Sequence, residues 1–144
     1  MDAYDMSWLA GRTLSGAELL GHGFWRFDFG DEIVLSVECP WRLIHINKIV
    51  LSSQDHGRTY GKGMPVDCET GIRGYLIGLH VRWAEVRIET RDIVLGFETG
   101  ARLEILPLST GFESWRIVKP CGYEAVAQGG GAILVWEGRG NGAI

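Results

Sequence analysis

Asp55 and His56 are the only acidic residue and histidine that stand next to each other in this sequence. A carboxylate beside an imidazole can orient the ring, take part in proton transfer or help to bind a metal ion. Arg58 and Lys62 follow in the same polar, glycine-rich stretch, residues 54–66, and long loops inside a domain are often functional. These four side chains are therefore candidate polar groups of a ligand-binding or catalytic site, with the loop as its lid.

The same stretch lacks the spacing that most catalytic and metal sites require. A metal ion needs three or four converging ligands, so Asp67 or Cys68 would have to join the acid–histidine pair, and a solvated loop explains these residues more simply. Lys62 is followed by glycine, where a phosphate-binding loop has Ser or Thr. No Gly-x-Ser-x-Gly element marks a nucleophilic serine. We therefore predict no catalytic residue, no cofactor and no metal site, which favours a protein that is not an enzyme.

Two Trp-Arg pairs, Trp41-Arg42 and Trp115-Arg116, are the candidate residues for binding a partner. Trp and Arg are enriched among the side chains that dominate protein–protein binding. Packing of each indole against the stem of its neighbouring arginine at a sheet corner explains the same pattern without any partner. The sequence leaves both interpretations open.

Length and composition indicate one acidic domain. The chain has 144 residues, of which 46% are hydrophobic and 22% charged, as is typical of folded proteins. Its net charge of −4 disfavours nucleic acid and anionic membranes, so we expect a basic protein as partner. No apolar run approaches the roughly 18 residues of a membrane span and the N-terminus lacks a signal sequence, so we expect a cytoplasmic protein. Cys39, Cys68 and Cys121 lack the spacing of a metal or redox pair and are expected to be reduced thiols.

Alternating apolar residues predict a mainly β fold, an antiparallel sandwich or partly open barrel. Trp25, Phe27 and Phe29 alternate before a turn at Gly30-Asp31, and residues 33–39 return to complete a hairpin. Further strands are expected within residues 41–53 and at 81–89, 92–98, 101–106, 112–119, 122–127 and 132–137.

Capping residues predict one or two short helices. Ser15 followed by Glu18 matches a capping box, and Gly21 would end that helix. Asp67 is the expected N-cap of a second helix, which Gly78 would end.

The stretch Ile93–Glu98 repeats the alternation of Ile33–Glu38, and each follows a Leu-Leu-Gly or Leu-Ile-Gly element. We interpret this as an internal duplication within one domain, and a chance match between apolar strands is the alternative. The expected boundaries are 1–137 for the domain, 15–53 and 72–137 for the halves, 54–66 for the loop between them, and 138–144 for a flexible glycine-rich tail.

Three elements follow one another in a fixed order within residues 19–137. They are Pro40-Trp41-Arg42-Leu43, Phe112-Glu113-Ser114-Trp115, and a terminal Gly-Gly-x-x-x-Val-Trp that ends at Trp136. In this order they resemble a bacterial family of small β-rich proteins of unknown function. Gln128 stands where that family has the proline of a Pro-Gly-Gly element, a departure at the local turn. The resemblance implies a β fold and a bacterial source, and it implies no reaction.

Three functional hypotheses follow. The acidic charge and the lack of a catalytic motif favour a non-enzymatic protein-binding module, for example an immunity or antitoxin-like inhibitor of a basic bacterial toxin. The alternative is a small-ligand-binding protein, or an enzyme with an unrecognised site, under the loop 54–66. A homodimer with a purely structural role is the third.

Overall fold

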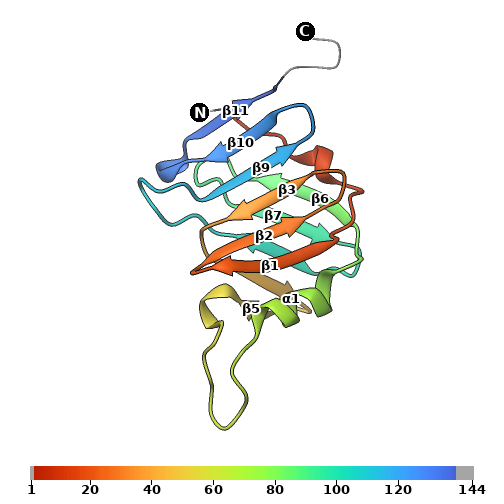
Figure 1. The fold of residues 1–144 in the computed structure, drawn as a ribbon, viewed down its shortest axis with the longest axis vertical. Coiled ribbons are helices and arrows are strands. Elements are labelled where there is room, and N and C mark those ends of the chain that lie inside the picture. The colour runs from red at the N-terminus through yellow and green to blue at the C-terminus, as the bar shows by residue number, and fades with distance from the viewer. Residues whose placement is uncertain (1, 139–144) are drawn as a thin grey trace.

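Two antiparallel β-sheets pack face to face in the computed structural model, which describes residues 2–138 (Figure 1). Sheet I has the order β1-β2-β3-β9-β10-β11, with bounds Gly16–Gly21, Phe24–Asp28, Val34–Val37, Trp115–Lys119, Tyr123–Ala127 and Ile133–Trp136. Sheet II has the order β5-β4-β8-β7-β6, with bounds Lys48–Ser52, Trp41–His45, Arg102–Ile105, Ile93–Phe97 and Val81–Val86. Both sheets end in edge strands, so the predicted mainly β, antiparallel fold is confirmed as a sandwich and not a closed barrel.

The chain contributes to sheet I twice. Strands β1–β3 form one side of sheet I, β4–β8 form sheet II, and β9–β11 return to complete sheet I. The two parts of sheet I join where β3 pairs with β9, with Val37 opposite Trp115. The inward-facing side chains of both sheets form one contiguous hydrophobic core. The largest of its fully buried side chains include Trp25, Trp41, Trp115, Phe27 and Phe97.

Helix α1, Cys68–Leu76, lies along the side of the sandwich where β1 and β5 are the edge strands (Figure 1). The Asp67 carboxylate accepts a hydrogen bond from the Thr70 N–H at 3.0 Å, so the predicted N-cap is confirmed. Ile72 and Leu76, four residues apart on one face, are fully buried, which explains why this segment packs as a helix. Among residues 2–138, no helix is long and apolar enough to cross a membrane.

The predicted helix that begins at Ser15 is wrong, because this segment forms strand β1. The Ser15 N–H and hydroxyl both donate to the Asp28 carbonyl, at 2.8 and 3.0 Å, and Ala17 turns into the core opposite Phe27. The segment from the capping box to Gly21 has only a few residues. It is too short for a helix that buries a continuous apolar face. Pairing with β2 supplies hydrogen bonds that so short a helix would lack.

The remaining predicted elements of the second half correspond to strands β6–β11. Residues 41–53 contain two strands, β4 and β5, joined by a turn at Ile46 and Asn47, whose φ angles are 49° and 61°. The two similar stretches lie in hairpins β2–β3 and β6–β7, but strand β1 precedes the first and helix α1 precedes the second. The internal duplication therefore stays a prediction. Residues 139–144 of the predicted tail lie outside the described residues.

Arg91 is a buried cation that ties three parts of the chain together. Its Nε donates to the Gly131 carbonyl at 2.9 Å, and one of its terminal nitrogens donates to the Asp2 carbonyl at 2.8 Å. The Arg91 carbonyl in turn accepts a hydrogen bond from the Trp115 indole N–H at 2.8 Å. The Trp115 side chain thus anchors the turn between β6 and β7 as well as filling the core.

Replacing Trp115 with Phe should lower the free energy of unfolding by about 1–3 kcal/mol, because it removes this hydrogen bond and leaves the buried Arg91 carbonyl without it. Urea denaturation followed by circular dichroism measures the change. The matched control is Trp83→Phe at a position that is 43% exposed, which should change stability by less than about 1 kcal/mol. Equal effects of the two substitutions would contradict the anchoring role of the Trp115 indole.

Candidate functional site

The loop between β5 and α1 extends away from both sheets (Figure 1). Two backbone hydrogen bonds of 2.8 Å close its base, from Gly57 N–H to the Val66 carbonyl and from Val66 N–H to the Arg58 carbonyl. All residues from 56 to 65 are exposed. Arg58 and Lys62 therefore stand on a projecting loop, which does not lie over the sandwich as a lid would.

Asp55 and His56 have local partners at the base of this loop. The Tyr60 hydroxyl donates to the Asp55 carboxylate, and the Cys68 backbone N–H donates to His56 Nδ1 at 3.0 Å. Burial raises the pKa of the Cys68 thiol to about 11, so this thiol is neutral and a poor nucleophile. These contacts organise the entry into α1 and provide no catalytic arrangement.

His56 also lines a cavity of about 590 Å³ beside the turn between β1 and β2. Asp55, Arg58 and Lys62 do not line it, so His56 is the one residue of the predicted ligand-loop set at this cavity. The other lining residues are Leu19, Leu20, Gly21, His22, Gly23, Trp25 and Ser53.

The indoles of the two Trp-Arg pairs lie in the core. Trp41 and Trp115 are fully buried, and the Trp41 ring packs edge to face against Trp25 with ring centroids 5.0 Å apart. Neither indole can touch a partner without unfolding of the sheet. Of the predicted partner-binding residues, only the two arginines remain accessible.

The two arginines lie on opposite faces of the sandwich. Arg42 is on the outer face of sheet II, where its Nε lies 2.7 Å from the nearly buried Glu104 carboxylate. Arg116 is on the outer face of sheet I, where its Nε lies 2.9 Å from the Glu124 carboxylate. The structure therefore does not bring the four predicted residues together on one surface, and each arginine already has an acidic partner.

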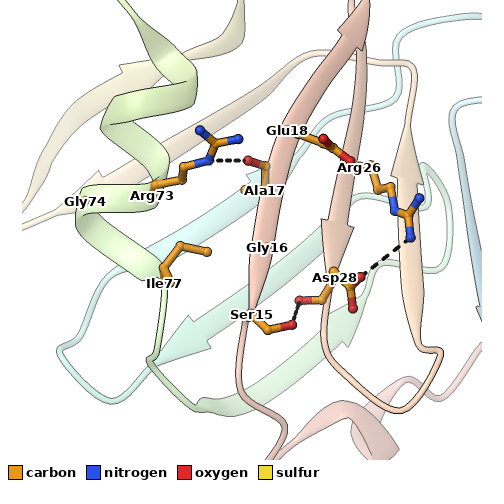
Figure 2. Close-up of a pocket in the computed structure, with 9 residues that line it drawn as sticks. All are labelled: Ser15, Gly16, Ala17, Glu18, Arg26, Asp28, Arg73, Gly74 and Ile77. Carbon is orange, nitrogen blue, oxygen red and sulfur yellow. Dashed lines mark hydrogen bonds and ion pairs between the residues drawn. The ribbon is translucent and has the colours of Figure 1, made fainter.

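A groove of about 710 Å³ runs between β1 and α1 (Figure 2). On its helix side, Arg73 Nε donates to the Ala17 carbonyl at 2.9 Å, and a second Arg73 nitrogen lies 3.3 Å from Glu69. The Glu69 carboxylate accepts the Leu19 N–H at 3.0 Å. These side chains bind the outer backbone groups of an edge strand, so we interpret the groove as a structural closure of sheet I. Its lining residues are Ser15, Gly16, Ala17, Glu18, Arg26, Asp28, Arg73, Gly74 and Ile77.

A third hollow, the end cavity, lies where the connections β1–β2, β3–β4 and β8–β9 meet. It has a volume of about 380 Å³, and its walls are mainly apolar. Phe112 and Leu108 are 82% and 74% exposed at this cavity, unusually high values for large apolar side chains. The lining residues are His22, Gly23, Phe24, Glu38, Cys39, Pro40, Leu108, Ser109, Phe112, Glu113 and Ser114.

Carboxylates give the end cavity its charge. Glu113 forms an ion pair with Arg116 at 3.2 Å, whereas the Glu38 carboxylate has no cationic partner among residues 2–138. Burial raises the pKa of the Cys39 thiol to about 12, so the cavity holds no thiolate nucleophile at neutral pH. A carboxylate beside apolar walls suits a cation on an aliphatic stem.

Sequence reasoning did not identify Glu38 or Phe112 as a candidate site residue. Phe112 falls within the strand predicted over residues 112–119, whereas β9 begins at Trp115 and leaves Phe112 in the connection before it. The available signal was Gly111, a turn-favouring residue directly before Phe112. Within the described residues, no group of three His, Cys, Asp or Glu side chains comes together as a metal site.

Known proteins do not assign this site. A scan against protein-family models, a search of curated proteins and a search of solved structures each found no match. The candidate function therefore depends on the geometry and charge of the chain itself.

Replacing residues 59–65 with two glycines should leave the fold intact and change the free energy of unfolding by less than about 1 kcal/mol, because the base of the loop is hydrogen bonded like a hairpin. Circular dichroism and urea denaturation measure this. A large loss of stability would show that the loop has a structural role. Loss of a small molecule that copurifies with the intact chain would support a ligand site under the loop.

Proposed function

We propose that this protein is a non-enzymatic protein-binding module that recognises a basic protein through the end cavity. The observation that carries the proposal is the Glu38 carboxylate, which has no cationic partner in the described chain and lies in the same cavity as the exposed Phe112 and Leu108. A carboxylate without an ion pair can form a charge-assisted hydrogen bond with a cation that a partner supplies.

An arginine or lysine side chain of the partner matches both features of the cavity. Its aliphatic stem would pack on Phe112 and Leu108, and its cationic head would meet Glu38. An arginine would also gain a cation–π contact with the exposed Phe112 ring. The net charge of −4 would speed encounter with a basic partner.

The concrete version of this proposal is an immunity or antitoxin-like inhibitor that binds a basic bacterial toxin in the cytoplasm. Its support is the acidic charge and the exposed apolar and acidic end cavity. An inhibitor of this kind blocks a surface of its partner and requires no catalytic group of its own.

A small-ligand-binding protein is the second candidate function. The observation that favours it is the cavity of about 590 Å³ that His56 lines. This cavity adjoins the end cavity through the shared residues His22 and Gly23, so a ligand and a protein partner would compete for neighbouring space.

Substitutions in the end cavity should weaken partner binding without unfolding the protein. Glu38→Gln removes the unpaired charge and Phe112→Ala removes an exposed ring, and each should raise Kd by about tenfold or more. The partner would be recovered by affinity capture from lysate of the source cell at near-physiological salt, and calorimetry with the purified pair would give Kd.

Two variants serve as matched controls. Glu32→Gln removes an exposed carboxylate just before β3, whereas Glu38 follows the other end of that strand. Ile46→Ala truncates a side chain that is 77% exposed in the turn between β4 and β5. Both should bind as the wild type does. Equal loss of binding in Glu38→Gln and Glu32→Gln would contradict a specific role of the end cavity.

A further inference from the structure

Strand β11, Ile133–Trp136, is an edge strand whose outer side meets nothing in the described part of the chain. It pairs with β10 on one side, and no backbone hydrogen bond from residues 2–138 reaches its other side. Its last three side chains are apolar and partly exposed, with Leu134 at 42%, Val135 at 41% and Trp136 at 51%. An uncharged strand of this kind presents free N–H and C=O groups to any extended chain that approaches it.

The edges formed by β1 and β5 are both closed by α1. At β1, the side chains of Glu69 and Arg73 bind outer backbone groups of the strand. At β5, Gly71 of the helix lies so close to Leu51 that an added Cβ would come within 2.9 Å of its side chain. The helix therefore leaves no room for another strand along these parts of either edge.

The N-terminal segment covers the start of the edge formed by β6. Gly11 N–H donates to the Val81 carbonyl at 2.7 Å, and Val81 N–H donates to the Arg12 carbonyl at 2.8 Å. Thr13 adds an isolated β-bridge to His80. Of the four sheet edges in the described chain, β11 is the one to which neither α1 nor the N-terminal segment makes a hydrogen bond.

The hydrogen-bond alternation of an antiparallel pair shows which groups of β11 face outward. Gln128 N–H donates to the Ala132 carbonyl at 3.0 Å, just before β11. Bonded pairs with β10 therefore continue at alternate residues from Ala132 onward. Ile133 and Val135 direct their N–H and C=O groups to the free edge.

We propose that β11 pairs antiparallel with β11 of a second copy of this chain, about a two-fold axis at Val135. The two copies of sheet I then form one continuous sheet. In this register, the backbone N–H of Val135 in each copy donates to the backbone carbonyl of Val135 in the other. Leu134 of one copy lies opposite Trp136 of the other, so the exposed apolar side chains cover one another.

The chemistry of β11 favours a copy of itself over another extended segment. Both faces of the strand are apolar, so the added strand must also be apolar on both faces, and β11 meets this requirement. Its four residues carry no charge, so pairing opposes no like charges. Beside Trp136, the Glu124 carboxylate is neutralised by Arg116 at 2.9 Å, which limits repulsion between two acidic chains. Closed two-fold dimers are also the commonest symmetric assemblies.

This surface is independent of the end cavity, because no residue of β11 lines that cavity. Loss of self-association would leave the proposed partner binding untouched. A dimer joined through β11 would expose two end cavities.

Sedimentation velocity over a wide range of protein concentration tests the pairing. The wild type should shift from the mass of one chain, 16.0 kDa, to twice that mass. Val135→Pro removes an outward N–H without removing a bond to β10, and Trp136→Lys places a charge opposite an apolar side chain. Each should weaken association by tenfold or more. The control Ile49→Lys changes an exposed apolar residue of edge strand β5 and should associate as the wild type does.

Amide hydrogen exchange measured by NMR identifies the interface. The N–H groups of Ile133 and Val135 should exchange more slowly at high concentration than at low concentration, while exposed loop amides keep the same rate. The proposal is overturned by a wild type that stays at the single-chain mass up to millimolar concentration. It is also overturned by a dimer that leaves these two amides unprotected. If circular dichroism shows that Val135→Pro does not fold, Trp136→Lys carries the test, and an undiminished dimer in that variant overturns the proposal.

Discussion

The pairing of β3 with β9 is the constraint on which the rest of the structure depends. It joins strands from the two ends of the chain, places Val37 opposite Trp115, and so completes the sheet that covers sheet II. The same register continues one residue beyond the strands, where the Glu38 N–H donates to the Ser114 carbonyl at 2.9 Å. This contact brings the free carboxylate of Glu38 beside the segment that bears Phe112. The end cavity is therefore a direct product of the long-range pairing that closes the core.

Closure of the sheet edges is the second organising feature. Helix α1 lies across β1 and β5, and the N-terminal segment covers the start of β6. Outer backbone groups of β1 and β6 therefore form hydrogen bonds within the protein. Arg73 is an example, because its guanidinium donates to the Ala17 carbonyl of edge strand β1 and forms an ion pair with Glu69. Charged groups used in this way stabilise the fold and are not free for ligands. The end cavity, with its exposed Phe112 and Leu108, and the outer side of β11 are two places where apolar or hydrogen-bonding groups stay available to other molecules.

Most of the elements could be predicted because their signals are local. Alternation of apolar residues located the strands of the second half, and Asp67 marked the start of α1 correctly because Ile72 and Leu76 follow at helical spacing. The same kind of capping signal failed at Ser15. There the short segment gains more from pairing with β2 than from a helix that could bury no continuous face. A capping residue indicates where a helix can begin, whereas the apolar spacing and length behind it decide whether one forms.

By itself, the sequence determined the fold class, the order of most strands along the chain, helix α1 and the acidic charge, because these follow from residue types at short spacing. The tertiary structure alone decided that Trp41 and Trp115 face the core, and that Arg42 and Arg116 lie on opposite faces. It alone placed Glu38 in one cavity with residues of the β8–β9 connection and left β11 as the uncovered edge. The physical reason is that side-chain periodicity is set within a few residues. Pairing between segments that are far apart in the chain decides the strand order, which face of each sheet is buried and which sheet edges are covered.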